Sequence, residues 1–174
     1  TPVVLVVADE SRHADLAAAA GSLGASTVLT AGLGGADSAL TVPIVDAVVA
    51  ASALVKPDAV LISNSIEGRD VAGRFAARTS AALCVDAVGV SRDDDGVLAQ
   101  HSVYGGAYNV TAGATYGPLV VTVRQGSIDA RSEAVDAPTI VGLQVEASGA
   151  PAAAITGFDE AVAVSSRPEL RGAA

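Results

Sequence analysis

The sequence predicts an α/β fold in which helices flank a parallel, Rossmann-like sheet, followed by an antiparallel β extension. Two observations predict this class. Over the first 90 residues, apolar runs alternate with segments of helical periodicity, as expected for parallel strands buried on both faces. After Val90, short strand-like segments follow one another without helices between them. A length of 174 residues suits one domain with a full core.

The first half of the chain alternates strands and helices with short connections. In chain order we expect a strand at 3–8, a helix at 14–23, a strand at 27–31, a helix at 40–55, a strand at 59–63, a helix at 70–80 and a strand at 83–88. The 40–55 helix has apolar residues at helical spacing after Ser38 as its cap, and Lys56-Pro57 ends it. This alternation predicts a parallel sheet with helices on both faces.

The second half of the chain lacks helical periodicity. A turn is expected at 91–96, followed by strands at 98–104, 107–112, 119–124 and 139–146. Gly105 and Gly106 predict a tight hairpin between the first two of these strands, because both residues tolerate positive φ. We therefore expect these strands to form the antiparallel extension.

The composition argues against several classes of function. A net charge of −9 disfavours a nucleic-acid partner or an anionic membrane surface, since both bind clustered Lys and Arg. Aromatic residues are 3% of the chain, which leaves little for stacking bases. The uncharged stretch at 16–36 is broken by glycines, so we expect no membrane insertion, and the start of the chain has no basic signal region. These features predict a cytoplasmic protein.

Neither a catalytic nor a metal-binding constellation is expected. Cys84 is the single cysteine, so it forms no internal disulfide or zinc site and is interpreted as a small buried hydrophobe. His13 and His101 have no nearby nucleophile or carboxylate arrangement that would make either a base. The carboxylates at 93–95 lack the ligand spacing of a calcium loop, which predicts a solvated turn. We therefore predict that the chain is not an enzyme.

One candidate binding site follows the 59–63 strand. Ser63, Asn64 and Ser65 lie where open α/β sheets bind ligands, so they form a candidate remnant nucleotide edge. The favoured alternative is that they cap the next helix and satisfy its backbone groups. The glycines at 32–35 lack the lysine and the spacing of a phosphate loop, and a plain turn is expected there.

A second candidate site lies on the 70–80 helix. Asp70, Arg74 and Arg78 recur every fourth residue and share one helix face. An ion pair between Asp70 and Arg74 would contribute roughly 0.2–0.5 kcal/mol, which leaves Arg78 as surplus positive charge in an acidic chain. Arg74 and Arg78 are therefore candidates for a partner interface, with a solvated helix face as the equal alternative.

Four segments together resemble one known family. They are GRDVAGRFAAR at 68–78, YGGAY at 104–108, PLVVTVR at 118–124 and SSRPEL at 165–170. In this order and spacing they resemble the N-terminal domain of the electron transfer flavoprotein α subunit, above all its actinobacterial members. The resemblance assigns 1–164 to that α/β domain and 165–174 to an interdomain linker. Arg167 and Pro168 are its expected hinge, because proline fixes its own φ and disfavours helix before it.

The resemblance implies a role in electron transfer. Members of this family are heterodimers of α and β subunits that carry electrons from acyl-CoA and other dehydrogenases to a membrane quinone oxidoreductase through one FAD. The C-terminal domain of α binds most of the FAD, and the β subunit holds an AMP. The chain is therefore expected to be the scaffold domain that packs on β, with no cofactor bound to it alone.

The chain departs from the family pattern in two places. After 165–170 only four residues follow where the family has a Gly-rich flavin domain, so that domain is expected to be absent. Near the start, one βα unit of roughly 25–30 residues is expected to be missing after Glu10. Two alternatives stay open. One is an independent nucleotide-binding domain of the adenine nucleotide α hydrolase-like class, to which the family fold is related; the other is a stand-alone interaction protein without flavin.

Overall fold

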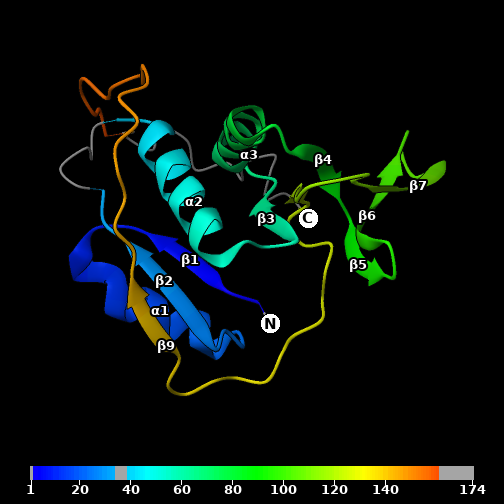
Figure 1. Cartoon of the computed structure of the whole chain (residues 1–174), viewed down its shortest axis with the longest axis horizontal. Coiled ribbons are helices and arrows are strands. Elements are labelled where there is room, and N and C mark those ends of the chain that lie inside the picture. Colours follow the sequence, from blue (N-terminus) through cyan, green and yellow to red (C-terminus); the bar gives the residue numbers. More distant parts are fainter. Residues whose placement is uncertain (1, 34–38, 161–174) are drawn as a thin grey trace, which may run out of the picture.

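The computed structural model describes residues 2–33 and 39–160 (Figure 1). The elements in chain order are β1 (Val4–Val7), the short 3-10 turn η1 (Glu10–Arg12), α1 (His13–Ser22), β2 (Thr27–Ala31), α2 (Val42–Val55), β3 (Ala59–Ser63), α3 (Ile66–Thr79), β4 (Ala82–Ala87), β5 (Gly89–Asp93), β6 (Gly96–Val103), β7 (Tyr108–Gly113), β8 (Leu119–Val123) and β9 (Thr139–Gly142).

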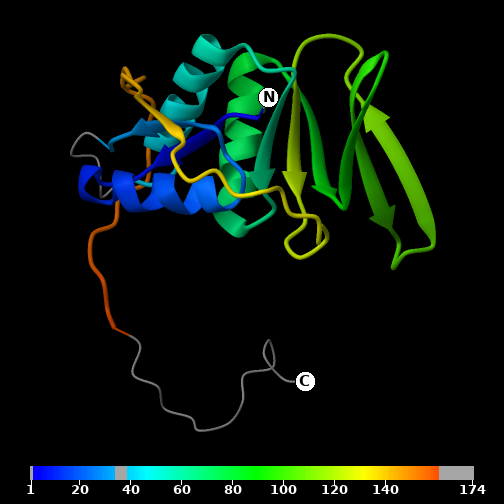
Figure 2. The same cartoon turned by 90° about the horizontal axis from the view of Figure 1, so that it is seen from below.

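The strands of the described residues form two parallel sheets and one antiparallel sheet. The first parallel sheet has the order β1-β2-β9 and the second the order β3-β8-β4. β5, β6 and β7 form the antiparallel sheet, which Figure 2 shows at the end of the molecule away from α1. The predicted class, a parallel α/β sheet with an antiparallel extension, is confirmed.

Helices cover the first parallel sheet on both of its faces. Val4 and Val6 of β1 pack with the cluster that contains Ala17 of α1, whereas Leu5 between them packs with the cluster that contains Val48 of α2. Successive side chains of a strand point to opposite faces, so α1 and α2 lie on opposite sides of β1 (Figure 1). This is the arrangement that right-handed βαβ crossovers produce.

β8 is the most deeply buried strand of the second parallel sheet. Val120 contacts the cluster of α2 and α3 that includes Phe75, while Leu119 and Val121 face the cluster that includes Ala99 of β6. These five side chains are at most 1% exposed. The antiparallel sheet therefore closes the face of β8 that lies opposite α3.

The assignment of two strands to the antiparallel extension was wrong. The segments at 119–124 and 139–146 instead give β8 and β9, which are parallel partners of β3 and β4 and of β2. Both are short apolar runs, and a run of this length does not indicate which strand it will pair with. Their order along the chain does not reveal their partners.

Several local expectations agree closely with the structure. β2 and β3 have the predicted bounds. The β6–β7 hairpin turns through Gly105 and Gly106 at φ of +66° and +89°, and Val103 lies opposite Tyr108. α3 begins four residues earlier than expected, because Ser65 caps it. The segment at 91–96 is only partly a turn, since β5 extends to Asp93.

After β8 the chain returns across α1 to reach β2. The Val135 amide donates a hydrogen bond to the Gly21 carbonyl oxygen at 2.8 Å, and a Cβ at Gly21 would lie 2.6 Å from the Val135 oxygen. Gly24, at φ +97°, leaves similar room for Ser132. These two glycines let the returning segment lie against α1 before β9 pairs with β2.

The start of the chain forms one continuous βαβ unit. β1 leads through η1 and α1 to β2, and β1 and β2 are direct neighbours with Val4 opposite Val28. The expectation that a βα unit is missing after Glu10 stays a prediction, and β1 and β2 pair directly with each other. Among the described strands, β1 has no partner on its other edge.

Candidate functional site

A network of polar side chains joins the carboxyl ends of β3, β4 and β8. The Asn64 amide nitrogen Nδ2 donates to Asp86 Oδ1 at 2.8 Å, and Thr122 Oγ1 donates to Asn64 Oδ1 at 2.9 Å. The Asp86 backbone amide in turn donates to Thr122 Oγ1 at 2.9 Å. The amide oxygen and nitrogen of Asn64 are thus both engaged within the protein.

Arg124 completes this carboxyl-edge network. Its Nε and Nη2 donate to Asp86 Oδ1 and Oδ2 at 3.0 and 2.6 Å, and Nη2 also donates to the Ser102 carbonyl oxygen at 3.2 Å. The hydrogen bonds from Arg124 lower the pKa of Asp86, and this effect outweighs the partial burial, which raises it. The same hydrogen bonds raise the pKa of Arg124. Two-point pairing of this kind fixes geometry as well as charge.

Asp86 adopts a backbone conformation that is unusual for a residue with a side chain. Its φ is +63°, and the register of β4 against β8 shifts between Cys84 and Ala87. Positive φ at a non-glycine residue persists when surrounding contacts over-determine it, and here those contacts are the hydrogen bonds to Arg124, Asn64 and Thr122. The bulge turns the Asp86 carboxylate toward the carboxyl edge of the sheet.

Ser65 does what the capping interpretation predicted. Its Oγ accepts a hydrogen bond from the Gly68 amide at 3.0 Å and caps α3. A Cβ at Gly68 would overlap the Ser63 carbonyl oxygen, so glycine lets the first turn of α3 lie directly on the end of β3. A nucleotide contact by Ser63, Asn64 or Ser65 stays a prediction, and two of these three side chains already have intramolecular partners.

Arg74 forms the expected pair within α3. Its Nε lies 2.9 Å from Asp70 Oδ1, and both side chains are about half exposed. Asp70 also accepts a hydrogen bond from Thr41 Oγ1 at 2.7 Å, so the pair is tied to the start of α2. The hydrogen bonds from Thr41 and Arg74 lower the pKa of Asp70.

Arg78 is not surplus charge, and that expectation was wrong. It forms an ion pair with Asp46 of α2, whose side chain is 4% exposed. Asp46 Oδ2 also accepts hydrogen bonds from the amide and the hydroxyl of Ser148, at 2.9 and 3.1 Å. Burial raises the pKa of Asp46, but the hydrogen bonds from Ser148 and Arg78 outweigh it and leave a net lowering. Asp46 therefore joins α2, α3 and the segment after β9.

His13 and the turn at 93–96 make local hydrogen bonds within the fold. His13 Nε2 lies 3.0 Å from the Ala8 oxygen and 3.2 Å from the Ala31 oxygen, at the ends of β1 and β2. Asp93 Oδ1 accepts the amides of Asp95 and Gly96, which makes 93–96 an ordinary polar turn. Partial burial raises the pKa of the Cys84 thiol.

Some expectations fall on residues that the structure does not describe. The hinge residues Arg167 and Pro168, the cap Ser38 and the two glycines at 34–35 lie outside 2–33 and 39–160. Within the described residues, no three His, Cys, Asp or Glu side chains gather as a metal site. No helix there has both the length and the apolar character to cross a membrane.

Comparison with known proteins decides the family. The model of the electron transfer flavoprotein domain matches residues 1–163. The chain belongs to this family. Its α/β fold fits the N-terminal domain of an electron transfer flavoprotein α subunit, and proteins of this family serve in electron transfer.

Three curated relatives are electron transfer flavoprotein α subunits. The chain is 35% identical over 169 residues to that of Mycobacterium leprae (strain TN), an overlap covering 97% of this chain and 52% of the relative. It is 36% identical over 152 residues to those of Mycobacterium tuberculosis strains CDC 1551 / Oshkosh and ATCC 25618 / H37Rv, covering 87% of this chain and 46% of each relative. The chain thus spans about half the length of the relatives it matches.

Proposed function

We propose that this chain is the scaffold portion of an electron transfer flavoprotein α subunit. Together with a β subunit, it would carry electrons from acyl-CoA and other dehydrogenases to a quinone oxidoreductase of the respiratory chain, from the cytoplasmic side. The observation that carries this proposal is the family match over residues 1–163. In this role the domain supplies shape and a docking surface, and the redox chemistry belongs to the flavin.

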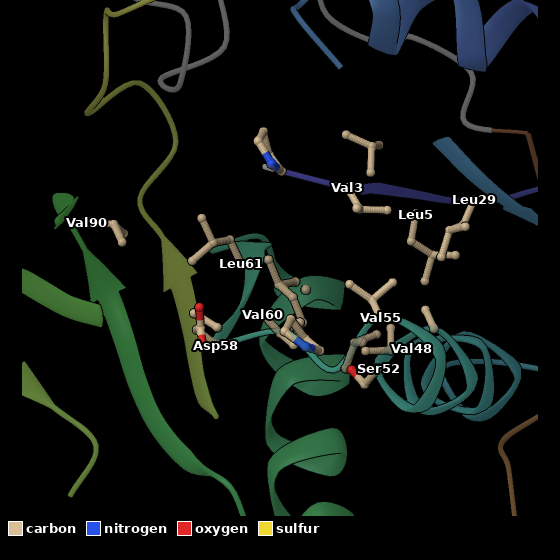
Figure 3. Close-up of a pocket in the computed structure, with 18 of the residues that line it drawn as sticks. Val3, Leu5, Leu29, Val48, Ser52, Val55, Asp58, Val60, Leu61 and Val90 are labelled. Carbon is tan, nitrogen blue, oxygen red and sulfur yellow. The ribbon is translucent and has the colours of Figure 1, made fainter. Parts of the chain in front are cut away.

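The described residues do not fit a flavin site. The polar groups at the carboxyl edge satisfy one another, and no buried polar side-chain atom of the described residues lacks a hydrogen bond. A cavity of about 1260 Å³ beside β1, β3 and α2 (Figure 3) has mainly aliphatic walls, and the described residues that line it include no aromatic side chain on which an isoalloxazine ring could stack. We therefore propose that the C-terminal part of the α subunit binds FAD and that the β subunit binds AMP.

The flavin assignment is tested by reconstitution. The chain is incubated with FAD, freed of excess by gel filtration, and its absorbance is measured at the flavin bands. We expect colourless protein, since the described polar groups are engaged with one another. Stoichiometric yellow protein would reject the scaffold assignment.

The partner assignment is tested by titration calorimetry with the β subunit of the same organism. We propose that the exposed face of α3 around Arg74 meets the β subunit. Arg74→Glu should then weaken association by roughly 1–3 kcal/mol if the residue lies at the buried centre of the interface. Arg78→Glu would be a poor probe, because it would also remove the ion-pair partner of the buried Asp46 carboxylate.

Arg92→Glu is the matched control. Arg92 is also exposed and paired with a single carboxylate, that of Asp58, but it lies on β5 rather than on α3. We expect its reversal to leave the affinity unchanged. Equal affinity for both variants would reject the α3 interface, and no measurable binding of the unaltered chain would reject the scaffold role.

A further inference from the structure

The segment that follows β9 is held to the domain by a small number of contacts. Residues 143–160 form neither helix nor strand, apart from an isolated bridge between Ala154 and Ala39. The segment, orange in Figure 1, passes beside the start of α2. Every residue from 146 to 160 is exposed, so burial of apolar surface contributes little to its attachment. Hydrogen bonds therefore decide whether this segment stays on the domain.

Two sets of hydrogen bonds attach the 143–160 segment to α2 and to the residues before it. The amide and the hydroxyl of Ser148 donate to Asp46 Oδ2 at 2.9 and 3.1 Å. Further along the segment, the Ala153 carbonyl oxygen accepts a hydrogen bond from the Leu40 amide at 2.8 Å. The segment is thus attached at two places that lie close together along the chain.

The attachment at Asp46 is the stronger of the two. Hydrogen bonds to an ionised acceptor are stronger than those between neutral groups, and the Asp46 side chain is 4% exposed, so little water competes for it. The second attachment joins neutral backbone groups of Leu40 and Ala153, both of which are exposed. The contact between Asp46 and Ser148 therefore contributes most to holding the segment.

A short, stiff turn couples the two attachments. Gly149 has a φ of +68°, and the Ala150 amide donates to Ser148 Oγ at 3.3 Å. Pro151 follows, and proline fixes its own φ. The contact at Asp46 thus holds the second attachment near its partner. Without that contact, the second attachment would have to close a longer loop by itself, at a higher cost in chain entropy.

We propose that Asp46 is the latch of this segment, and that residues 144–160 open from the domain as one unit when its contact with Ser148 breaks, while the parallel sheets stay folded. In the open form the chain would leave the domain at the end of β9. Because an extended chain spans about 3.3 Å per residue, residue 155 could then move by up to roughly 40 Å. The latch thus controls where the chain beyond residue 154 departs from the domain, whatever the function of the protein.

Native-state hydrogen exchange on the whole chain tests the latch. The reporters are the amides of Ser148 and Leu40, one at each attachment. We expect Asp46→Asn to accelerate exchange at both amides by about tenfold, although the Leu40 amide bonds to Ala153 rather than to Asp46. Acceleration at Ser148 alone would overturn the proposal, because the two attachments would then open independently.

Asp70→Asn is the matched control for this variant. Asp70 also accepts a hydrogen bond from a hydroxyl group and pairs with an arginine of α3, but these partners, Thr41 and Arg74, lie outside the 143–160 segment. We expect exchange at the Ser148 amide to be unchanged in this control. Equal acceleration in both variants would overturn the role of Asp46 as the latch.

A core variant shows whether the segment opens while the domain stays folded. Leu119→Ala weakens the packing of β8, so it should accelerate the β8 amides that exchange through global unfolding. The amides of Ser148 and Leu40 should keep their rates, since their opening does not involve β8. Acceleration of these two amides together with β8 would mean that the segment detaches only on unfolding, and would overturn the proposal.

Two glycines of the segment give a measurement that leaves the buried carboxylate intact. A Cβ at Gly149 or at Gly157 would meet no atom within 4 Å, but of the two only Gly149 has a positive φ. Gly149→Ala should therefore strain the turn and accelerate exchange at Ser148 and Leu40 by about fivefold, while Gly157→Ala leaves both rates unchanged. Equal rates in the two variants would overturn the coupling of the attachments. No part of this test depends on the β subunit or on flavin.

Discussion

β8 and β1 have nearly the same composition and very different surroundings. β8 is Leu-Val-Val-Thr-Val, and its first four residues are at most 1% exposed. β1 is Val-Leu-Val-Val, and every one of its residues is only half-buried. β8 has a partner strand on each edge and a packed layer on each face, whereas β1 pairs with β2 alone among the described strands and lines an apolar cavity. The burial of a strand therefore depends on its neighbours more than on its own residues.

The largest expected effect is a loss of stability in the core, and it tests the difference in burial between β8 and β1. Leu119→Ala in β8 should lower the free energy of unfolding by about 2–5 kcal/mol, because its side chain is 1% exposed and its loss leaves a cavity. Leu5→Ala in β1 should cost less than half as much, because its side chain is only half-buried. Urea denaturation of both variants measures the difference. Equal losses would show that β1 is as well packed as β8.

A second prediction concerns the tight packing of α3 on β3. Gly68→Ala should destabilise by about 1–3 kcal/mol, because the new Cβ would overlap the Ser63 carbonyl oxygen. Gly73→Ala on the same helix meets no atom within 4 Å and should stabilise by up to about 1 kcal/mol, since alanine favours helix. Thermal unfolding of both variants gives opposite shifts if the contact at Gly68 is real, and shifts of one sign if it is not.

A third prediction concerns the buried Asp46, which contacts Arg78 of α3 and Ser148 in the segment after β9. Asp46→Asn should destabilise by about 1–2 kcal/mol at neutral pH, because it removes the buried partner of Arg78 and weakens the contact to Ser148. The pKa of Asp46 is lowered in the folded protein, so its carboxylate stabilises the fold above the unfolded pKa of about 3.9 and loses this effect as the pH falls below it.

The pH dependence of stability shows how much of the effect of Asp46 comes from its negative charge. The difference in unfolding free energy between the unaltered chain and the Asp46→Asn variant should be largest near pH 6 and shrink as the pH falls below about 4. Urea titrations at a series of pH values measure it. A difference that stays constant down to about pH 3 would mean that the ion pair with Arg78 contributes nothing through charge.

The smallest expected effect is at the exposed counterpart of this pair. Arg74→Ala removes an ion pair in which both side chains are about half exposed, so it should cost no more than about 0.5 kcal/mol. The loss should shrink further in high salt, because exposed charges are screened. A loss as large as that of Asp46→Asn would show that exposure does not separate the two pairs of α3.

Periodicity along the sequence determined the helices, most strands and the class of the fold. β2, β3 and the Gly105-Gly106 hairpin follow from apolar runs and from the backbone freedom of glycine, which are local properties. The loop at Asn64 was also identified, because chain connectivity alone puts it at the carboxyl end of a strand.

Tertiary structure decided what pairs with what. Asn64 bonds to Asp86 and Thr122, which lie 22 and 58 residues from it along the chain, and Arg124 lies beside them. One sequence feature could have predicted this network. Asp86 and Arg124 are charged residues near the ends of apolar runs, and the carboxyl ends of parallel strands meet at one edge of a sheet. Arg78 pairs with a carboxylate 32 residues away, which spacing along one helix cannot reveal. Local periodicity records backbone preference, whereas edges and pairs depend on which segments the folded chain brings together.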